Sequence, residues 1–245
     1  MAAQVFRLGE PRALARRAPL LKRLEMKIEW LGHATFIITS QNGTKILTDP
    51  YESEGPYGTI VHSPIKEKAD IVTVSHSHSD HCHVPLHLEK EAQVIRDKIN
   101  KQIKGITIRS VGSFHDSLGG KQRGSNTIFI FEVDGIKIAH FGDLGHSLDN
   151  TMLKELGPID IALIPVGGVF TIDAKMADDI IKKLKPKITI PMHFKTPKVR
   201  FDIDGVEVFL QGKDNVERLQ SAEIEISPEV LSSGPSKIIV LKYSH

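Results

Sequence analysis

Four histidines and one aspartate fall within the eight residues 76–83, directly after a short apolar segment. That segment, 69–74, reads Ala-Asp-Ile-Val-Thr-Val, and its β-branched residues predict a short buried strand. The strand has to end at the border of the core, because the loop that follows is polar. Imidazole and carboxylate groups are thereby placed beside the core instead of inside it. A fold for this chain must therefore keep the edge of the core, where this loop begins, accessible to solvent.

The spacing of these side chains is typical of metal ligands. His76 and His78 are two residues apart, so in an extended chain they point the same way and can share one divalent cation. Asp80 and His81 follow a predicted turn and are placed to meet a second cation. The alternative is a solvated loop rich in serine and histidine. Five ligand-capable residues in eight positions favour the metal site.

Histidine or aspartate recurs where other predicted strands end. The strands predicted at 106–108, 136–141 and 188–192 lead to His115, Asp143 and His193. Glycines on both sides of Asp143 allow close approach of the backbone there. Chance explains one such coincidence, but several on one face indicate a common centre.

The remaining pattern predicts strands first and then alternating helices and strands. Further strands are expected at 26–30, 35–39, 45–48, 93–95, 127–133, 159–166 and 238–241. Helices are expected at 148–156, at 175–184 and near 215–219. Two sheets covered by helices satisfy this order.

Several other polar residues have two interpretations. His33, between two strands, is either a hydrogen-bonded turn residue or part of the rim of the site. In the long loop 51–68, Tyr51, Tyr57 and His62 are candidates to meet a substrate, although a solvated position is the ordinary expectation for each. His83 and His87 are expected at the surface or behind the ligands, and Cys82 is expected to be a small packed residue.

Charge and composition narrow the class of protein. The 245 residues carry a net charge of +2, which indicates no strong affinity for nucleic acid. Residues 1–25 hold six basic and two acidic side chains, a net +4, which leaves −2 for residues 26–245. A single cysteine excludes an intrachain disulfide and fits a reducing cytoplasm, so we expect a cytoplasmic protein. No apolar run is long enough to span a bilayer.

The basic extension, residues 1–25, has alanine, leucine and arginine at helical spacing. It could be an amphipathic helix on a surface or partner, or a transit-like segment. We favour a third interpretation, in which the natural start is Met26 and the domain comprises residues 26–245.

The ligand residues resemble the metallo-β-lactamase superfamily. Its His-x-His-x-Asp-His signature is matched by His76, His78, Asp80 and His81, and its later ligands by His115, Asp143 and His193. Four segments are more specifically similar to the branch that contains ascorbate-6-phosphate lactonase. These are Trp30 to Phe36, Thr48-Asp49-Pro50, His140 to His146 and Ile190 to Phe194.

The resemblance implies an α/β (α+β) fold, a four-layer αββα sandwich of two mixed sheets flanked by helices. It implies two divalent metal ions, the first held by His76, His78 and His115, and the second by Asp80, His81 and His193. Asp143 would bridge them. Nitrogen ligands suit zinc, with manganese or iron as alternatives. The oxygen-reducing di-iron branch usually has glutamate at position 78, so His78 favours hydrolysis over redox chemistry.

We therefore predict a metal-dependent hydrolase that uses a metal-bridging hydroxide on an ester, lactone or phosphoester. Asp80 is expected to receive a proton as well, and His146 or His33 to assist protonation of the leaving group. Four cations are candidates to bind a small anionic substrate, although each is more often simply solvated: Arg123, Lys195, Lys198 and Arg200. An RNA- or DNA-processing metallonuclease and a non-catalytic metal-binding protein are the alternatives. Homo-oligomer formation is left open.

Overall fold

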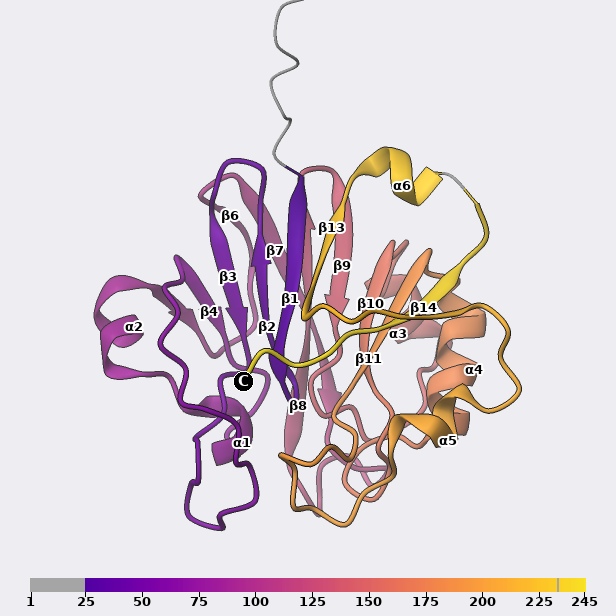
Figure 1. The fold of residues 1–245 in the computed structure, drawn as a ribbon, viewed down its shortest axis with the longest axis horizontal. Coiled ribbons are helices and arrows are strands. Elements are labelled where there is room, and N and C mark those ends of the chain that lie inside the picture. The colour runs from indigo at the N-terminus through magenta and orange to yellow at the C-terminus, as the bar shows by residue number, and fades with distance from the viewer. Residues whose placement is uncertain (1–24, 233) are drawn as a thin grey trace, which may run out of the picture.

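Two mixed β-sheets form the centre of the molecule (Figure 1). The computed structural model describes residues 25–232 and 234–245. The first sheet has the order β13 (Glu223–Ile226), β1 (Met26–Gly32), β2 (Thr35–Thr39), β3 (Lys45–Thr48), β4 (Ile71–Thr73) and β5 (Gln93–Ile95). The second has the order β12 (Val216–Arg218), β14 (Lys237–Val240), β11 (Ile188–Met192), β10 (Ile161–Pro165), β9 (Ile136–His140), β8 (Ser125–Val133), β7 (Ile106–Phe114) and β6 (Asn100–Ile103).

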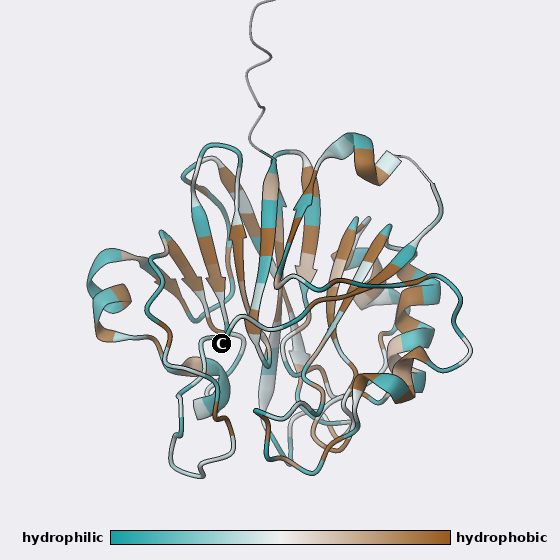
Figure 2. Cartoon of the chain, viewed as in Figure 1, coloured by the Kyte–Doolittle hydropathy of each residue, from teal (hydrophilic) through white to brown (hydrophobic). Residues whose placement is uncertain are grey.

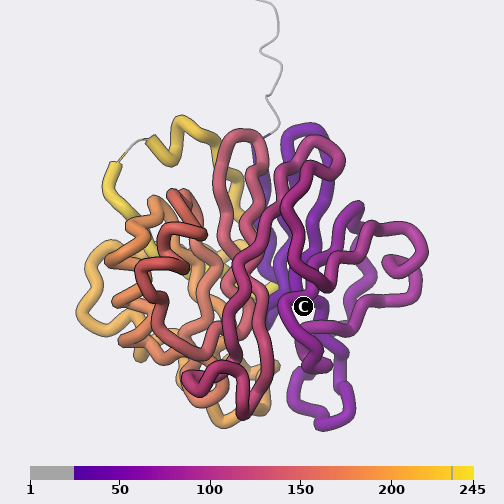
Figure 3. The backbone as a smooth tube through the Cα atoms, turned by 180° about the vertical axis from the view of Figure 1, so that it is seen from behind, coloured from indigo at the N-terminus to yellow at the C-terminus, as the bar shows by residue number. Residues whose placement is uncertain are grey.

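The two sheets are stacked, and helices lie outside them. Figure 1 has the first sheet in front, and Figure 3, seen from behind, has residues 106–133 of the second sheet in front. The helices are α1 (Ser79–Cys82), α2 (Leu86–Glu91), α3 (Asn150–Leu156), α4 (Ala174–Leu184), α5 (Val206–Leu210) and α6 (Pro228–Ser232). The predicted fold class, two mixed sheets flanked by helices, is confirmed.

The main core fills the space between the sheets. Apolar side chains of the first sheet, such as Phe36 and Ile46, belong to the same buried cluster as Phe129 and Leu163 of the second. In Figure 2 many strand residues are brown, the colour of hydrophobic residues. Every residue of β10 and β11 is buried, because these parallel strands are covered on both faces.

The loops that carry the predicted metal ligands all lie at one edge of the two sheets. In β3, β4 and β5 the chain runs in parallel, as it does in β9, β10 and β11. The loops after β4, β7, β9 and β11 therefore emerge on the same side, which is the lower side of Figure 1. This topology brings together segments that are far apart in the sequence.

The sequence pattern missed or misjudged several short elements, among them α5, β13, β12 and β6. The helix expected near 215–219 is wrong, because these residues form the edge strand β12, paired in parallel with β14. Strand β6 was missed, since three of its four residues are exposed and polar. Both elements follow from pairing with a neighbouring strand, which outweighs local propensity. The predicted basic extension, apart from Glu25, lies outside the described residues.

Part of the loop 51–68 is buried in a second hydrophobic cluster, although a solvated loop was expected. Tyr51 and His62 are each only 1% exposed, whereas Tyr57 is 82% exposed. The Tyr51 hydroxyl donates to the Ser63 carbonyl at 2.9 Å, and His62 Nδ1 donates to the His245 carbonyl at 3.1 Å. A segment almost two hundred residues away thus covers these side chains, and no local pattern signals it.

No helix within residues 25–232 and 234–245 is long and apolar enough to cross a membrane.

Burial lowers the pKa of His62 from 6.5 to about 4. Between these pH values the unfolded chain protonates His62 and the folded chain does not, so acidification should lower the free energy of unfolding. We expect His62→Gln to be less stable than wild type at about pH 7.5. Between about pH 7.5 and about pH 5, the free energy of unfolding of His62→Gln should fall by about 2 kcal/mol less than that of wild type. Urea denaturation of both metal-free proteins measures this; equal losses would contradict it.

Candidate metal centre

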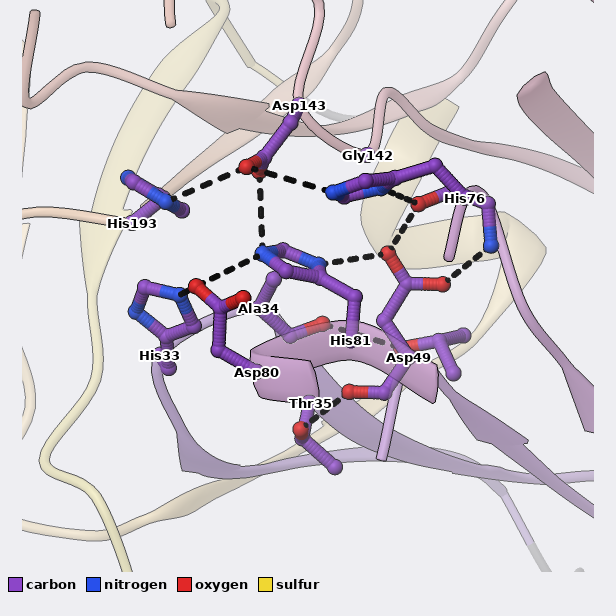
Figure 4. A network of polar contacts seen from close by, with 12 residues as sticks. His33, Ala34, Thr35, Asp49, His76, Asp80, His81, Gly142, Asp143 and His193 are labelled. Atoms are coloured by element: carbon purple, nitrogen blue, oxygen red, sulfur yellow. Dashed lines mark hydrogen bonds and ion pairs between the residues drawn. The ribbon is translucent and has the colours of Figure 1, made fainter. Parts of the chain in front are cut away.

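The Asp143 carboxylate contacts four of the predicted ligands, and Figure 4 shows it beside His76, His81 and His193. Its oxygens are 3.7 Å from His76 Nε2, 3.2 Å from His81 Nε2, 3.1 Å from His115 Nε2 and 3.4 Å from His193 Nε2. The carboxylate is 2% exposed. Four imidazoles from three distant segments therefore converge on one buried anion.

Among the described residues, two of the three clusters of possible ligand atoms correspond to the predicted ligand sets, and the third joins Asp49 to His76 and His81. His76, His78 and His115 can offer ring nitrogens within 4.8 Å of one another, and Asp80, His81 and His193 form a second group that also includes His33. Asp143 lies between the two groups. The structure thus brings together all seven residues predicted as metal ligands.

Unpartnered polar atoms indicate that this arrangement fits cations. Among the described residues, His76 Nε2, His81 Nε2 and Asp143 Oδ1 are buried and make no well-aligned hydrogen bond, although His81 Nε2 and Asp143 Oδ1 lie 3.2 Å apart as an ion pair when His81 is protonated. Such atoms are costly unless something binds them. Burial lowers the pKa of His76 to about 3, which keeps the imidazole neutral and able to bind a metal. The donor set of imidazole nitrogen and carboxylate oxygen suits zinc and related divalent ions.

The raised pKa of His81 shows that the carboxylates beside it favour a positive charge at this position. Burial disfavours its charged form, but Asp143 and Asp80 outweigh burial and raise the pKa of His81 well above its usual value. Without a metal, a proton on His81 offsets the two carboxylates. A cation bound here would take over that charge and release the proton.

Local backbone geometry sets the positions of the ligands. After β4, the one-turn helix α1 places Asp80 and His81 next to each other at the site. Gly142 has φ +52°, and a Cβ on it would lie 2.4 Å from Asn126 Oδ1 and 2.6 Å from Ser75 Cβ. A Cβ on Gly145 would lie 2.3 Å from the His115 carbonyl carbon. The expected close backbone approach beside Asp143 is confirmed.

Gly142→Ala should lower the free energy of unfolding by about 2 kcal/mol or more, because the methyl group adds overlap with buried atoms to an unfavourable φ. Gly135→Ala is the matched control. Gly135 also has positive φ, but no non-neighbouring atom of the described residues lies within 4 Å of the position that a methyl group would take there, so only the backbone cost of about 1 kcal/mol applies. Chemical denaturation of the two variants measures the difference. Equal losses would contradict the close contact.

Asp49 is a supporting residue whose role the sequence interpretation missed. Its Oδ2 accepts a 2.9 Å hydrogen bond from His81 Nδ1 and also contacts the Ser75 hydroxyl, which lies 2.9 Å from His76 Nδ1 (Figure 4). One buried carboxylate therefore orients a histidine of each ligand group. The only sequence signal is that Thr48-Asp49-Pro50 ends a strand at the same border of the sheets.

Asp49→Asn should weaken metal binding by about 10- to 100-fold, since it disturbs the orientation of His76 and His81 together. Competition with a chromophoric chelator gives the affinity. Asp134→Asn is the matched control, because Asp134, at the β8–β9 turn, accepts the Gln41 amide at 2.7 Å and its side chain has no further hydrogen bond in the described part of the chain. Unchanged affinity in Asp49→Asn would refute the orienting role.

His33 and His146 are not placed to protonate a leaving group. His33 is fully buried, its Nε2 lies 3.2 Å from Asp80 Oδ2, and burial lowers its pKa to about 3. His146 accepts from the Phe114 amide at 3.1 Å and donates to the Ser147 carbonyl at 2.8 Å, so both ring nitrogens are engaged. We therefore assign His33 to supporting Asp80 and His146 to holding the backbone.

A cavity of about 470 Å³ opens onto the ligands. Its polar floor includes His78, Asp80, His115, Asp143 and His193, and its walls include Tyr57, Thr59, Arg123, Phe170 and Phe201. Of the four predicted anion-binding cations, Arg123 alone lines it. Lys195 bonds the Phe201 carbonyl, and Arg200 bonds the Gly58 carbonyl at 3.2 Å.

Comparison with known proteins agrees with this geometry. A family profile described as a β-lactamase superfamily domain matches residues 27–193. A UPF0173 metal-dependent hydrolase of Thermococcus onnurineus is 31% identical over 224 residues, which cover 81% of this chain and 98% of the relative. A UPF0173 metal-dependent hydrolase of Carboxydothermus hydrogenoformans is 33% identical over 204 residues, covering 73% and 89%.

Solved structures extend the comparison to the fold. A crystal structure from Thermotoga maritima, provisionally described as a Zn-dependent hydrolase of the metallo-β-lactamase superfamily, is 34% identical with a TM-score of 0.70. The match covers 88% of this chain and 98% of that one. A metallo hydrolase of Ignicoccus hospitalis is 25% identical with a TM-score of 0.60, covering 90% and 96%.

Proposed function

The chain belongs to the metallo-β-lactamase superfamily, among the UPF0173 metal-dependent hydrolases, and we propose that it hydrolyses small carboxylic esters or lactones with two bound divalent cations. The observation that supports this most is the buried Asp143 carboxylate among four imidazoles at the floor of a 470 Å³ cavity. Enzymes that act on small molecules usually have their reactive groups at the bottom of a pocket large enough for the substrate.

The ligands would divide as the two groups in the structure do. His76, His78 and His115 would hold one cation, Asp80, His81 and His193 the other, and Asp143 would lie between them. Zinc is the proposed metal, because imidazole nitrogens outnumber carboxylates. Divalent cations in such a pair acidify water and stabilise negative charge that develops on the substrate oxygen.

Asp80 is the residue best placed to orient an attacking water. It lines the cavity, and His33 holds its Oδ2 from behind. Burial raises the pKa of Asp80, but His81 and the hydrogen bond from His33 outweigh this and keep the pKa well below its usual value. Asp80 therefore stays ionised, which suits a ligand and hydrogen-bond acceptor better than a store for protons.

The cavity favours a small acyl substrate over the alternatives. A nuclease needs a basic surface, yet residues 26–245 carry a net charge of −2. A phosphoester usually demands several cationic side chains, and among residues 25–232 and 234–245 Arg123 is the one Lys or Arg that lines the cavity. Membership of the ascorbate-6-phosphate lactonase-like branch remains a prediction.

The test is hydrolysis of a panel of aryl esters, lactones, phosphodiesters and RNA by protein that has been stripped with a chelator and then reloaded with zinc or manganese. We expect ester or lactone hydrolysis that disappears on stripping and returns on reloading. His76→Ala should lower kcat/KM by about 1,000-fold or more, through loss of a ligand of the first cation.

His146→Gln is the control, and its activity should stay near that of wild type. Hydrolysis that survives stripping or His76→Ala would refute the proposal. Cleavage of RNA without ester or lactone hydrolysis would indicate the nuclease instead. Full metal occupancy without turnover of any substrate would indicate a non-catalytic metal-binding protein.

A further inference from the structure

We infer that Arg123 and the aromatic wall beside it form a subsite for a carboxylate on an apolar body, so that the substrate is an ester or lactone that carries a free carboxylate. This inference rests on the proposed hydrolysis for its reaction and adds the class of substrate. It is drawn from the contacts of the turn 117–124 and of the cavity wall.

The turn is tied to the metal centre through Asp116, the residue after His115. Asp116 Oδ1 accepts the amides of Leu118 and Gly120 at 2.8 and 2.9 Å, and its Oδ2 accepts those of Gln122 and Arg123 at 2.9 and 2.8 Å. Four hydrogen bonds to one buried carboxylate hold the turn in a single shape. The backbone of Arg123 is therefore fixed relative to a metal ligand.

The side chain of Arg123 is held against the wall but not neutralised. Its guanidinium carbon lies 5.6 Å from the centroid of the Phe170 ring, and Phe170 packs against Phe201 with centroids 5.4 Å apart. Within residues 25–232 and 234–245, no carboxylate forms an ion pair with Arg123. Stacking on an aromatic face orients a guanidinium while leaving its N–H donors free. A free, oriented guanidinium matches the two oxygens of a carboxylate.

The rest of the wall indicates what lies between the carboxylate and the reactive bond. Phe170, Phe201 and Tyr57 are aromatic, and Phe201 approaches the His33 ring at 6.0 Å, behind the second ligand group. The apolar surface thus extends from Arg123 to the metal centre. A ring or short hydrocarbon chain would cover it, with the carboxylate at one end and the scissile bond at the other.

The experiment compares release of 4-nitrophenolate from two esters of one ring system, the mono(4-nitrophenyl) ester of terephthalic acid and the methyl ester of that compound, in which the free carboxylate is masked by a methyl group. Zinc-loaded wild type should show a clearly lower KM for the charged ester. Arg123→Gln should remove the preference by raising the KM for the charged ester about 10- to 100-fold, with little change in kcat. Arg123→Lys should restore part of it. Lys121→Gln is the matched control, since Lys121 is exposed on the same turn and does not line the cavity.

Calorimetry with monomethyl terephthalate and metal-free protein separates the subsite from the reaction. Wild type and Lys121→Gln should bind this monoanion, and Arg123→Gln should bind it at least 10-fold more weakly. If binding depends on Arg123 but neither ester is hydrolysed, the proposed function fails and the subsite stands. If both esters are hydrolysed in a metal-dependent way but Arg123→Gln changes neither KM nor binding, the subsite is overturned and the function stands.

Discussion

The structure depends on a dense, desolvated group of imidazoles and carboxylates at the border of two sheets. Asp143 is removed from water and surrounded by four ring nitrogens, of which His76 Nε2 and His81 Nε2 make no well-aligned hydrogen bond. Charged and polar groups in such a setting are costly unless a compensating charge binds. Metal binding would supply that charge, so part of its free energy would appear as stability of this end of the fold. The same interaction would then hold the loops together and create the reactive centre.

The supporting residues hold several of the ligands in place from the buried side of the centre. Asp49 reaches both His81 and Ser75, and Asn126 accepts the Asp143 amide at 2.9 Å while it donates to Ser113. His33 supports Asp80 from the buried side. His76, His81 and Asp80 thus each have a second contact that limits side-chain rotation before any cation arrives, and the backbone of Asp143 is fixed by Asn126. Such preorganisation lowers the cost of assembling the site.

Sequence patterns predicted which candidate ligands converge, because each follows a predicted strand, and strand ends on one side of a parallel arrangement must meet. The strands at 35–39, 45–48 and 93–95 were predicted with the bounds that they have. Residues that act through contacts distant in sequence could not be predicted. The role of Asp49 depends on His81, and the burial of His62 depends on His245. The edge strand β12 depends on its pairing with β14.

The way Asp116 holds its turn has a consequence for how such enzymes diversify. All four of its hydrogen bonds go to backbone amides, so they do not specify which side chains the turn displays. Replacements at Leu118, Gln122 or Arg123 would leave the scaffold and the neighbouring ligand His115 intact. Natural selection could therefore exchange one chemical preference for another on this turn while the inherited reaction centre stays unaltered. Relatives with the same ligands need not share a substrate.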